Sequence, residues 1–140
     1  MSIAILSWGS LTWNPRDLPI SGKWQQDGPV LPIEFSRISS DGRLTLVIDE
    51  QDGVPVTTRY ARRPRTNLDD ATADLRVRGG TVKDRIGYVN LVRNTKRGWA
   101  RQHHPAACDT IKAWAKAGGW NAVVWTALTP NFEDDLLKMQ

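Results

Sequence analysis

Apolar residues along this chain come in short runs separated by turn-forming residues, the pattern expected of strands and short helices in a compact fold. The run Ile3-Ala4-Ile5-Leu6 predicts a buried first strand over residues 3–8. Further strands are predicted over residues 31–36, 43–48, 54–60, 86–92 and 120–128. The last of these is almost continuously apolar, which is typical of a central strand covered on both faces.

The strands at 31–36 and 43–48 predict a hairpin, because Asp41-Gly42 supplies a favoured turn between them. Leu44, Leu46 and Ile48 occupy alternate positions of the second strand, so we expect their shared face to lie on the core. Two other stretches are rich in turn-forming or polar residues and are predicted to be loops, residues 13–30 and residues 94–104.

Helical spacing of apolar residues predicts helices over residues 67–78, 105–117 and 131–139. In the middle one, Pro105 suits the first helical position, and Cys108, Ile111 and Ala115 share one stripe that we expect to be buried. Gly118 then ends the helix. Strands interspersed with helices, without strict alternation, predict a mixed α+β fold.

Length and composition are those of one compact domain spanning residues 1–140. No apolar run approaches the roughly 20 residues that a membrane helix needs, and the first residues lack the charged start of a signal peptide. The lone Cys108 has no partner for an internal disulfide, which fits a reducing compartment. A cytoplasmic protein with no membrane partner is therefore expected, and its oligomeric state is left open.

Candidate chemistry begins where the first strand ends. The buried run leads directly into Trp8, Gly9 and Ser10. Gly9 permits backbone dihedral angles that a side chain would forbid, and Ser10 offers a hydroxyl group beside several main-chain N–H groups. Such groups converge readily on a small, oxygen-rich ligand. The alternative is that Gly9-Ser10 is an ordinary turn.

A longer string around this loop resembles the start of the gamma-glutamylcyclotransferase-like superfamily, particularly its ChaC branch. The string reads Ser7-Trp8-Gly9-Ser10-Leu11-Thr12-Trp13-Asn14-Pro15, with Trp8 where the family usually has Tyr. The resemblance implies a small mixed β-barrel or highly curved sheet surrounded by helices. It also implies that Trp8, Gly9, Ser10 and Leu11 line the substrate site, where main-chain N–H groups hold the substrate's carboxylate.

The resemblance further implies an intramolecular reaction, in which the α-amine of a γ-glutamyl group attacks its own side-chain carbonyl. The products are 5-oxoproline and a free amine, and neither a metal nor an organic cofactor is needed. A base must accept the ammonium proton, and donors must hold the developing oxyanion. The family's catalytic glutamate is expected near residues 67–80, a stretch that holds aspartates but no glutamate.

Glu34 is the substitute acid that we single out, because a carboxyl group within an apolar strand is costly to place without a function. Glu50 and Glu133 have structural explanations, in a turn and in the first turn of a helix. His103-His104 is expected in a surface loop rather than at a metal site, since no acid or Cys stands at suitable spacing. Ser10 lacks a nucleophile motif and is expected to form hydrogen bonds.

Two other functions remain open. One is a member of the same fold that binds a metabolite or a protein without catalysis. The other is a basic nucleic-acid-binding module, since the formal net charge is +4 and the sequence pI is about 9.6. That module would use the basic cluster at residues 59–65 and the aromatic Trp99. A basic stripe distant from the Gly9-Ser10 loop would favour it.

Overall fold

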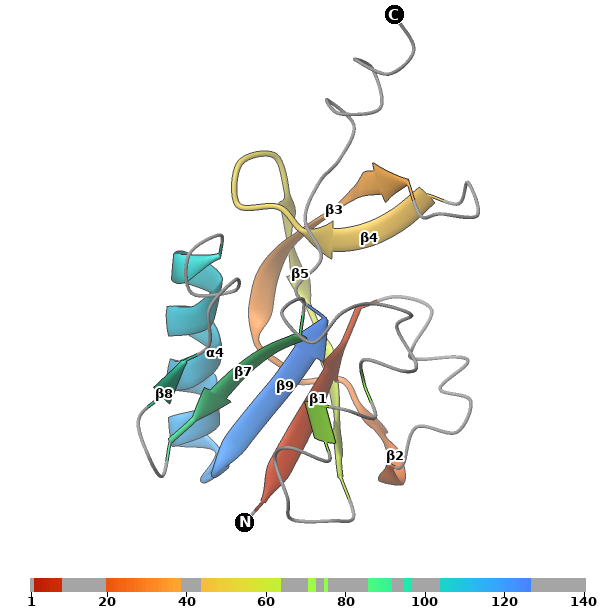
Figure 1. Cartoon of the computed structure of the whole chain (residues 1–140). Helices are drawn as coiled ribbons and strands as arrows, with labels where there is room; N and C mark the ends of the chain where they lie inside the picture. The colour runs from red at the N-terminus through yellow and green to blue at the C-terminus, as the bar shows by residue number, and fades with distance from the viewer. Residues whose placement is uncertain are drawn as a thin grey trace, which may run out of the picture.

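The computed structural model (Figure 1) describes residues 2–8, 20–38, 44–63, 71–72, 75, 86–91, 95–96 and 104–126. The described strands form a six-stranded sheet in the order β2-β6-β1-β9-β7-β8 and a three-stranded sheet in the order β4-β3-β5. Their bounds are β1 (Ile3–Ser7), β2 (Ser21–Gln25), β3 (Val30–Ile38), β4 (Leu44–Ile48), β5 (Val54–Thr57), β6 (Arg59–Arg62), β7 (Ile86–Asn90), β8 (Thr95–Lys96) and β9 (Ala122–Thr126).

The first and last described strands are neighbours at the centre of the larger sheet. β1 pairs in parallel with β9 and antiparallel with β6, and β9 pairs antiparallel with β7 on its other side. Every residue of β1 is buried, as are Ala122, Val123, Val124 and Trp125 of β9. The predictions of a buried first strand and of a central strand covered on both faces are confirmed.

Side chains alternate across this sheet and form two separate cores. Ala4 and Leu6 of β1 pack in one cluster with Val123 and Trp125 of β9. Ile3 and Ile5 pack in the other cluster, with Val124. The first cluster also holds Leu31, Ile33 and Ile48 from the three-stranded sheet and four residues of the helix, so it is the core between the two sheets.

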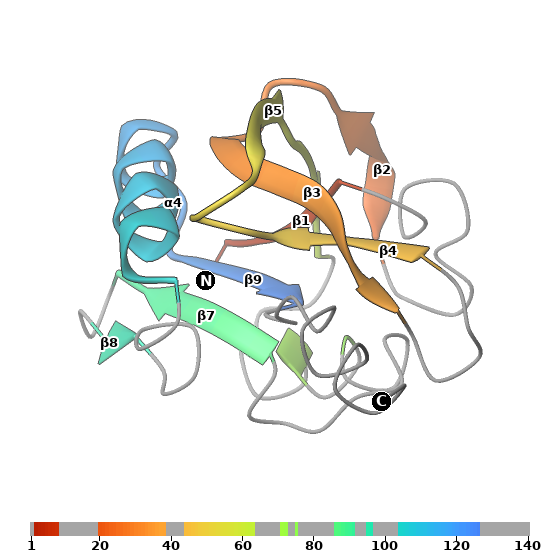
Figure 2. The ribbon, with the colours of Figure 1, turned by 90° about the horizontal axis from the view of Figure 1, so that it is seen from above.

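The predicted hairpin is confirmed as β3 and β4, which pair antiparallel from Ile33↔Ile48 to Ile38↔Leu44. Seen from above, these strands lie across β1 and β9, with the helix beside both sheets (Figure 2). The core face of β4 carries Leu46 and Ile48, as expected. On β3, Ile33 is buried, whereas Phe35 is 50% exposed, and the pairing with β4 becomes irregular between Phe35 and Arg37.

The prediction of one strand over residues 54–60 was wrong. The segment is two strands in different sheets, since β5 pairs with β3 and β6 pairs with β1 and β2. Thr58 lies between them, fully buried, and its backbone N–H and its hydroxyl both donate to the carbonyl oxygen of Pro29. The Thr58 carbonyl in turn accepts the N–H of Gly28 (2.9 Å). Because Thr58 forms these bonds to the segment before β3, it belongs to neither β5 nor β6. The chain passes from the three-stranded sheet to the six-stranded sheet at this residue.

The helix predicted over residues 105–117 is confirmed as α4 (Pro105–Ala117). Its buried residues include the predicted Cys108, Ile111 and Ala115. Pro105 stands at its start, and Gly119 beyond its end has a positive φ of 75°, which glycine adopts without strain. The helix packs against β3, β7 and β9.

Other predictions are corrected in detail. The loop predicted over residues 13–30 contains β2, whose exposed, polar sequence carries no hydrophobic alternation. The loop predicted over residues 94–104 contains the two-residue β8. Ala71, Thr72 and Leu75 are helical within the helix predicted at 67–78, whereas the helix predicted at 131–139 lies outside the described residues.

The α+β class is confirmed. Of the two predicted alternatives, a small barrel or a highly curved sheet, the barrel is not formed among the described strands, which make two open sheets. The six-stranded sheet ends at β2 on one side and at β8 on the other, and these two edge strands do not pair with each other. No helix in the described part of the chain is long and apolar enough to cross a membrane.

Candidate functional site

Trp8 directly follows β1, at the end of the sheet where the parallel strands β1 and β9 both stop. Its indole packs against the core between the sheets, and its Nε1 donates to the backbone carbonyl of Leu46 on β4 (3.1 Å). The carboxyl end of β1 is thereby fixed to the hairpin. The other predicted members of this loop, Gly9, Ser10 and Leu11, lie outside the described residues.

Trp125 is the largest buried side chain at this end of the sheet. It is register partner to Gly87 on β7, and it is completely buried. A Cβ on residue 87 would lie 2.6 Å from the Trp125 Nε1, so glycine is required for the indole to lie across β7. A glycine within an apolar strand such as this one is typical of a position where another group comes close. The approaching group is the Trp125 ring.

The Trp125 Nε1–H has no hydrogen-bond partner among the described residues. An indole nitrogen can only donate, and leaving a buried donor unsatisfied costs about 1–3 kcal/mol. Trp24 Nε1, on the other face of the sheet, is also without a partner in this part of the chain. Trp24 is only partly buried, whereas Trp125 is fully enclosed. Trp125 therefore holds a hydrogen-bond donor inside the core near Trp8.

Glu34 lies on β3 opposite Val47 of β4, a residue that is only 2% exposed. Its carboxylate accepts the backbone N–H of the next residue, Phe35, at 2.9 Å. Strand alternation puts Glu34 on the face of β3 opposite Ile33, and Ile33 belongs to the cluster that Trp8 packs against. Trp8 and Glu34 thus reach the same hairpin but from opposite faces of its sheet.

Two further polar residues, Glu50 and His104, lie at the start of α4. Glu50, expected to have a structural role, accepts the backbone N–H of Ala107 (2.8 Å) and so caps the helix from another segment of the chain. His104 was expected in a surface loop, but that is wrong, because it is 3% exposed. Its carbonyl accepts the N–H of Cys108, so it is part of the packed helix start. His103 lies outside the described residues.

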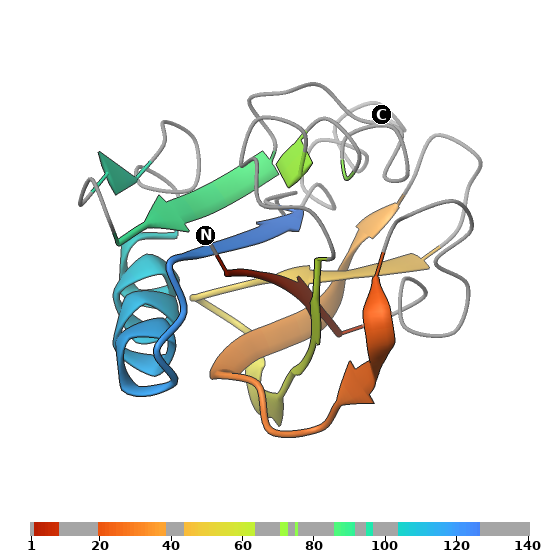
Figure 3. The same ribbon diagram turned by 90° about the horizontal axis from the view of Figure 1, so that it is seen from below.

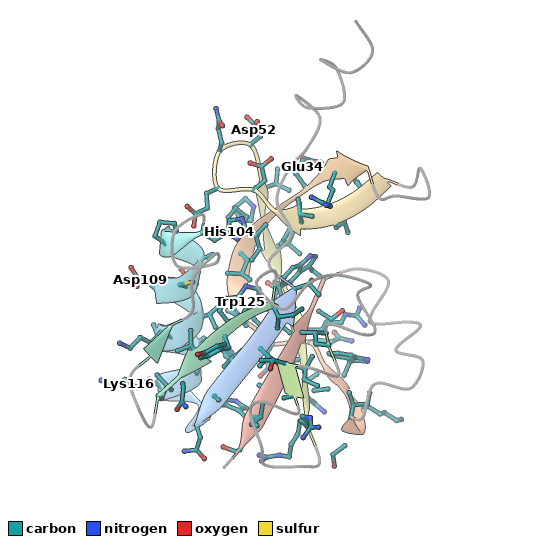
Figure 4. All side chains as sticks on the ribbon, viewed as in Figure 1. Glu34, Asp52, His104, Asp109, Lys116 and Trp125 are labelled. Atoms are coloured by element: carbon teal, nitrogen blue, oxygen red, sulfur yellow. The ribbon has the colours of Figure 1, made fainter. Side chains whose placement is uncertain are left out.

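Figure 4 shows Glu34 beside the β4–β5 turn that carries Asp52, with His104 below them and Trp125 lower still, near the middle of the molecule. Among the described residues, no group of three His, Cys, Asp or Glu side chains is placed to hold a metal ion. The described residues around Trp8 and Trp125 therefore offer hydrogen bonding from indole and main-chain groups, and the Glu34 carboxylate lies on the other face of the hairpin.

A second region lies at the other end of the sheet, where β1 begins and α4 ends (Figure 3). There Tyr60 of β6 meets Trp114 and Trp120 edge to face, with ring centroids 5.0 and 5.6 Å away. The two tryptophans stack on each other at 6.1 Å and an interplanar angle of 16°. We call these three residues the aromatic cluster. It lines an open groove of about 470 Å³ together with Ser2, Asp27 and Arg62.

Charged groups border the aromatic cluster. The Arg62 guanidinium lies 4.7 Å from the ring centroid of Trp120, within cation–π range. The backbone carbonyl of Asp27 accepts the Trp114 Nε1–H (3.0 Å). Burial raises the pKa of Tyr60 above its ordinary value, and the negative charge of Asp27 and its hydrogen bond with Tyr60 raise it further, while Arg62 opposes the shift. Lys23 of β2 lines an adjoining hollow that shares Tyr60, Arg62 and Trp120.

This groove could not be predicted from the sequence. Its members come from residues 2, 27, 60–62 and 114–120, which only the folded sheet brings together. One signal was present, since Tyr60 lies within the basic cluster at 59–65.

Comparison of the chain with protein-family models, with curated proteins and with solved structures finds no match.

Proposed function

We propose that this chain is a divergent gamma-glutamylcyclotransferase-like protein that binds a small γ-glutamyl or other amino-acid-derived ligand where β1 and β9 end. The observation that carries the proposal is the Trp125 Nε1–H, a fully buried donor without a partner among the described residues. A buried polar group in a native protein calls for an explanation, and a ligand carbonyl or carboxylate oxygen supplies one.

The position of this donor supports the same proposal. In open α/β sheets, ligands bind beyond the carboxyl ends of the parallel strands, and we apply that rule here by analogy. β1 and β9 are the parallel pair here, and β1 leads into Gly9, Ser10 and Leu11, whose main-chain N–H groups are the proposed carboxylate site. One small ligand would then be held at both ends, with its carbonyl oxygen at the Trp125 N–H and its carboxylate at the N–H groups of the loop.

Cyclisation is the proposed reaction for a γ-glutamyl ligand. The α-amine nitrogen forms a bond to the side-chain carbonyl carbon, the bond from that carbon to the leaving amine breaks, and a proton moves from the attacking nitrogen to the leaving nitrogen. Glu34 is the proposed carrier of that proton. Because its carboxylate is held by Phe35 N–H on the opposite face from Trp8, the structure also favours a second function, binding without catalysis.

A thermal-shift titration tests binding. Because a ligand of the folded state raises its melting temperature by mass action, γ-glutamyl dipeptides, glutathione or 5-oxoproline should stabilise the chain. Trp125→Phe should remove most of that stabilisation. Trp24→Phe is the matched control, since it deletes an indole donor on the opposite face that is also buried without a partner among the described residues, and it should leave the stabilisation intact. Equal responses of both variants would contradict the assignment of Trp125.

An assay for 5-oxoproline release separates the two functions. Product formation that Glu34→Gln abolishes while ligand-induced stabilisation persists would establish cyclisation with Glu34 as the proton carrier. Stabilisation of the unchanged chain without product would establish binding alone. Gly9→Val should abolish binding in a folded protein, because it blocks close approach of the loop backbone, and unchanged affinity in that variant would remove the loop from the site.

A further inference from the structure

The groove beside the aromatic cluster has a composition that the proposed ligand site does not explain. Ser2 and the residues after α4 line it at the start of β1, and Tyr60 and Arg62 line it from β6, where their register partners are Leu6 and Ala4. Its aromatic rings are partly buried rather than enclosed, and Arg62 and Lys23 are exposed. Two cations and three aromatic rings therefore meet at one accessible surface.

We propose that this groove binds single-stranded nucleic acid, one nucleotide deep, with phosphate at Arg62 and Lys23 and a base against the aromatic cluster. Non-specific single-strand binders combine cations along the backbone path with aromatic side chains on which bases stack. The volume of about 470 Å³ is large enough for one nucleotide. The formal net charge of +4 adds a favourable long-range attraction for a polyanion.

The geometry gives each end of the groove a different role. Arg62 and Tyr60 lie on the same face of β6, and Ser21 and Gln25 of β2 are their register partners, so the cationic end is built on the sheet. Asp27 stands on the Trp114 side, where its carboxylate already accepts a hydrogen bond from Tyr60. A carboxylate has two oxygens, and the second can accept an N–H from a base edge. All common bases carry such an N–H, so binding should tolerate sequence changes.

Strand alternation provides a matched control for charge. Arg59 is also exposed on β6, but it is one residue from Tyr60 and three from Arg62, which puts it on the other face of the sheet. Arg59→Gln and Arg62→Gln remove the same charge from the same strand. Only Arg62→Gln removes it from the groove.

The experiment measures fluorescence anisotropy of a labelled single-stranded oligonucleotide of mixed sequence with the full chain between about 50 and 200 mM salt. Arg62→Gln should weaken binding and reduce the slope of log K against log salt by about 0.7, the value for one phosphate contact on a single strand. Trp120→Leu should weaken it roughly 5- to 150-fold, as expected for loss of one stacked base. Arg59→Gln should leave the salt slope close to that of the unchanged chain.

Three results would overturn the proposal. The first is no binding by the unchanged chain up to about 10⁻⁴ M at the lowest salt, the weak end of non-specific affinity. The second is equal weakening by Arg59→Gln and Arg62→Gln, which would show diffuse charge attraction. The third is equal affinity for an acidic peptide of matched charge, which would show a protein partner. Circular dichroism of Trp120→Leu checks its fold, and Arg62→Gln tests the groove without altering the cluster's rings.

Discussion

Tryptophan side chains lie at both ends of the six-stranded sheet, but the burial and the hydrogen bonding of their indole N–H groups differ. Where β1 and β9 end, Trp125 is completely buried, with its N–H unpartnered among the described residues. Where β1 begins, Trp114 is only partly buried and its N–H donates to the Asp27 carbonyl. The first end holds a polar donor inside a packed core, and the second presents satisfied rings to solvent.

Under the two proposals, the same residue type would serve two kinds of recognition. A buried donor confers selectivity, because a ligand lacking the matching acceptor leaves the donor unpaired. Open aromatic rings discriminate less, because every planar partner has a face to stack. The closed end therefore suits one small ligand, and the open end suits a repetitive polymer.

The largest difference in stability is expected between alanine substitutions at two glycines, one from each end of the sheet. Gly87→Ala should lower the free energy of unfolding by about 1–3 kcal/mol, because the added methyl group overlaps the enclosed Trp125 ring. Gly118→Ala places its methyl group 3.0 Å from Trp120 at the open groove, where the ring has room to shift, so a change below about 1 kcal/mol is expected. Urea unfolding measures both. Equal losses would show that the groove is packed as tightly as the core.

A smaller difference in stability is expected between variants that remove the indole hydrogen bonds of Trp8 and Trp114. Trp8→Phe removes the part-buried bond to Leu46 and should cost about 0.5–1.5 kcal/mol, in addition to the smaller ring's lost packing. Trp114→Phe removes the exposed bond to Asp27, whose carbonyl can turn to water, so its loss should be smaller. Thermal unfolding of the two variants side by side checks the order. A larger loss at Trp114 would reverse the contrast between the ends.

The smallest effect concerns pH and sharpens the description of the open end. Because the pKa of Tyr60 is raised in the folded state, unfolded Tyr60 ionises first as pH rises. The contribution of Tyr60 to stability is present in full below about pH 10 and is lost as pH rises through its folded pKa. Tyr60→Phe should therefore lose less stability than the unchanged chain between about pH 9 and 11. Denaturant unfolding across that range tests this, and parallel curves would contradict it.

Elements set by local pattern could be predicted from the sequence, and those set by tertiary contacts could not. The buried run of β1, the Asp41-Gly42 hairpin and the stripe of α4 each carry their own signal. The break at Thr58 has none, because it depends on hydrogen bonds to Pro29, which lies 29 residues away. β2 was missed because its strand pairing with β6 is not accompanied by a hydrophobic alternation.

The same distinction applies to the candidate sites. Trp8 and Glu34 could be proposed from the sequence because one follows a buried strand and the other interrupts an apolar one. Trp125 was assigned only to the core, because sequence cannot show that an indole N–H lacks a partner. The aromatic cluster draws on residues more than 50 positions apart, so only the sheet register and the end of α4 bring Tyr60 to Trp114.

The position of β9 has a consequence for how the protein folds. This strand lies between β1 and β7, and the Ser2 backbone N–H donates to Asn121 just before it, across 119 residues. Until residues 122–126 have been synthesised, β1 and β7 each have an unpaired edge, and the central hydrogen bonds of the sheet cannot form. Long-range pairing of this kind slows folding and leaves strand edges open to other chains. Completion of the six-stranded sheet therefore waits for β9, which is the last of the described strands to be synthesised.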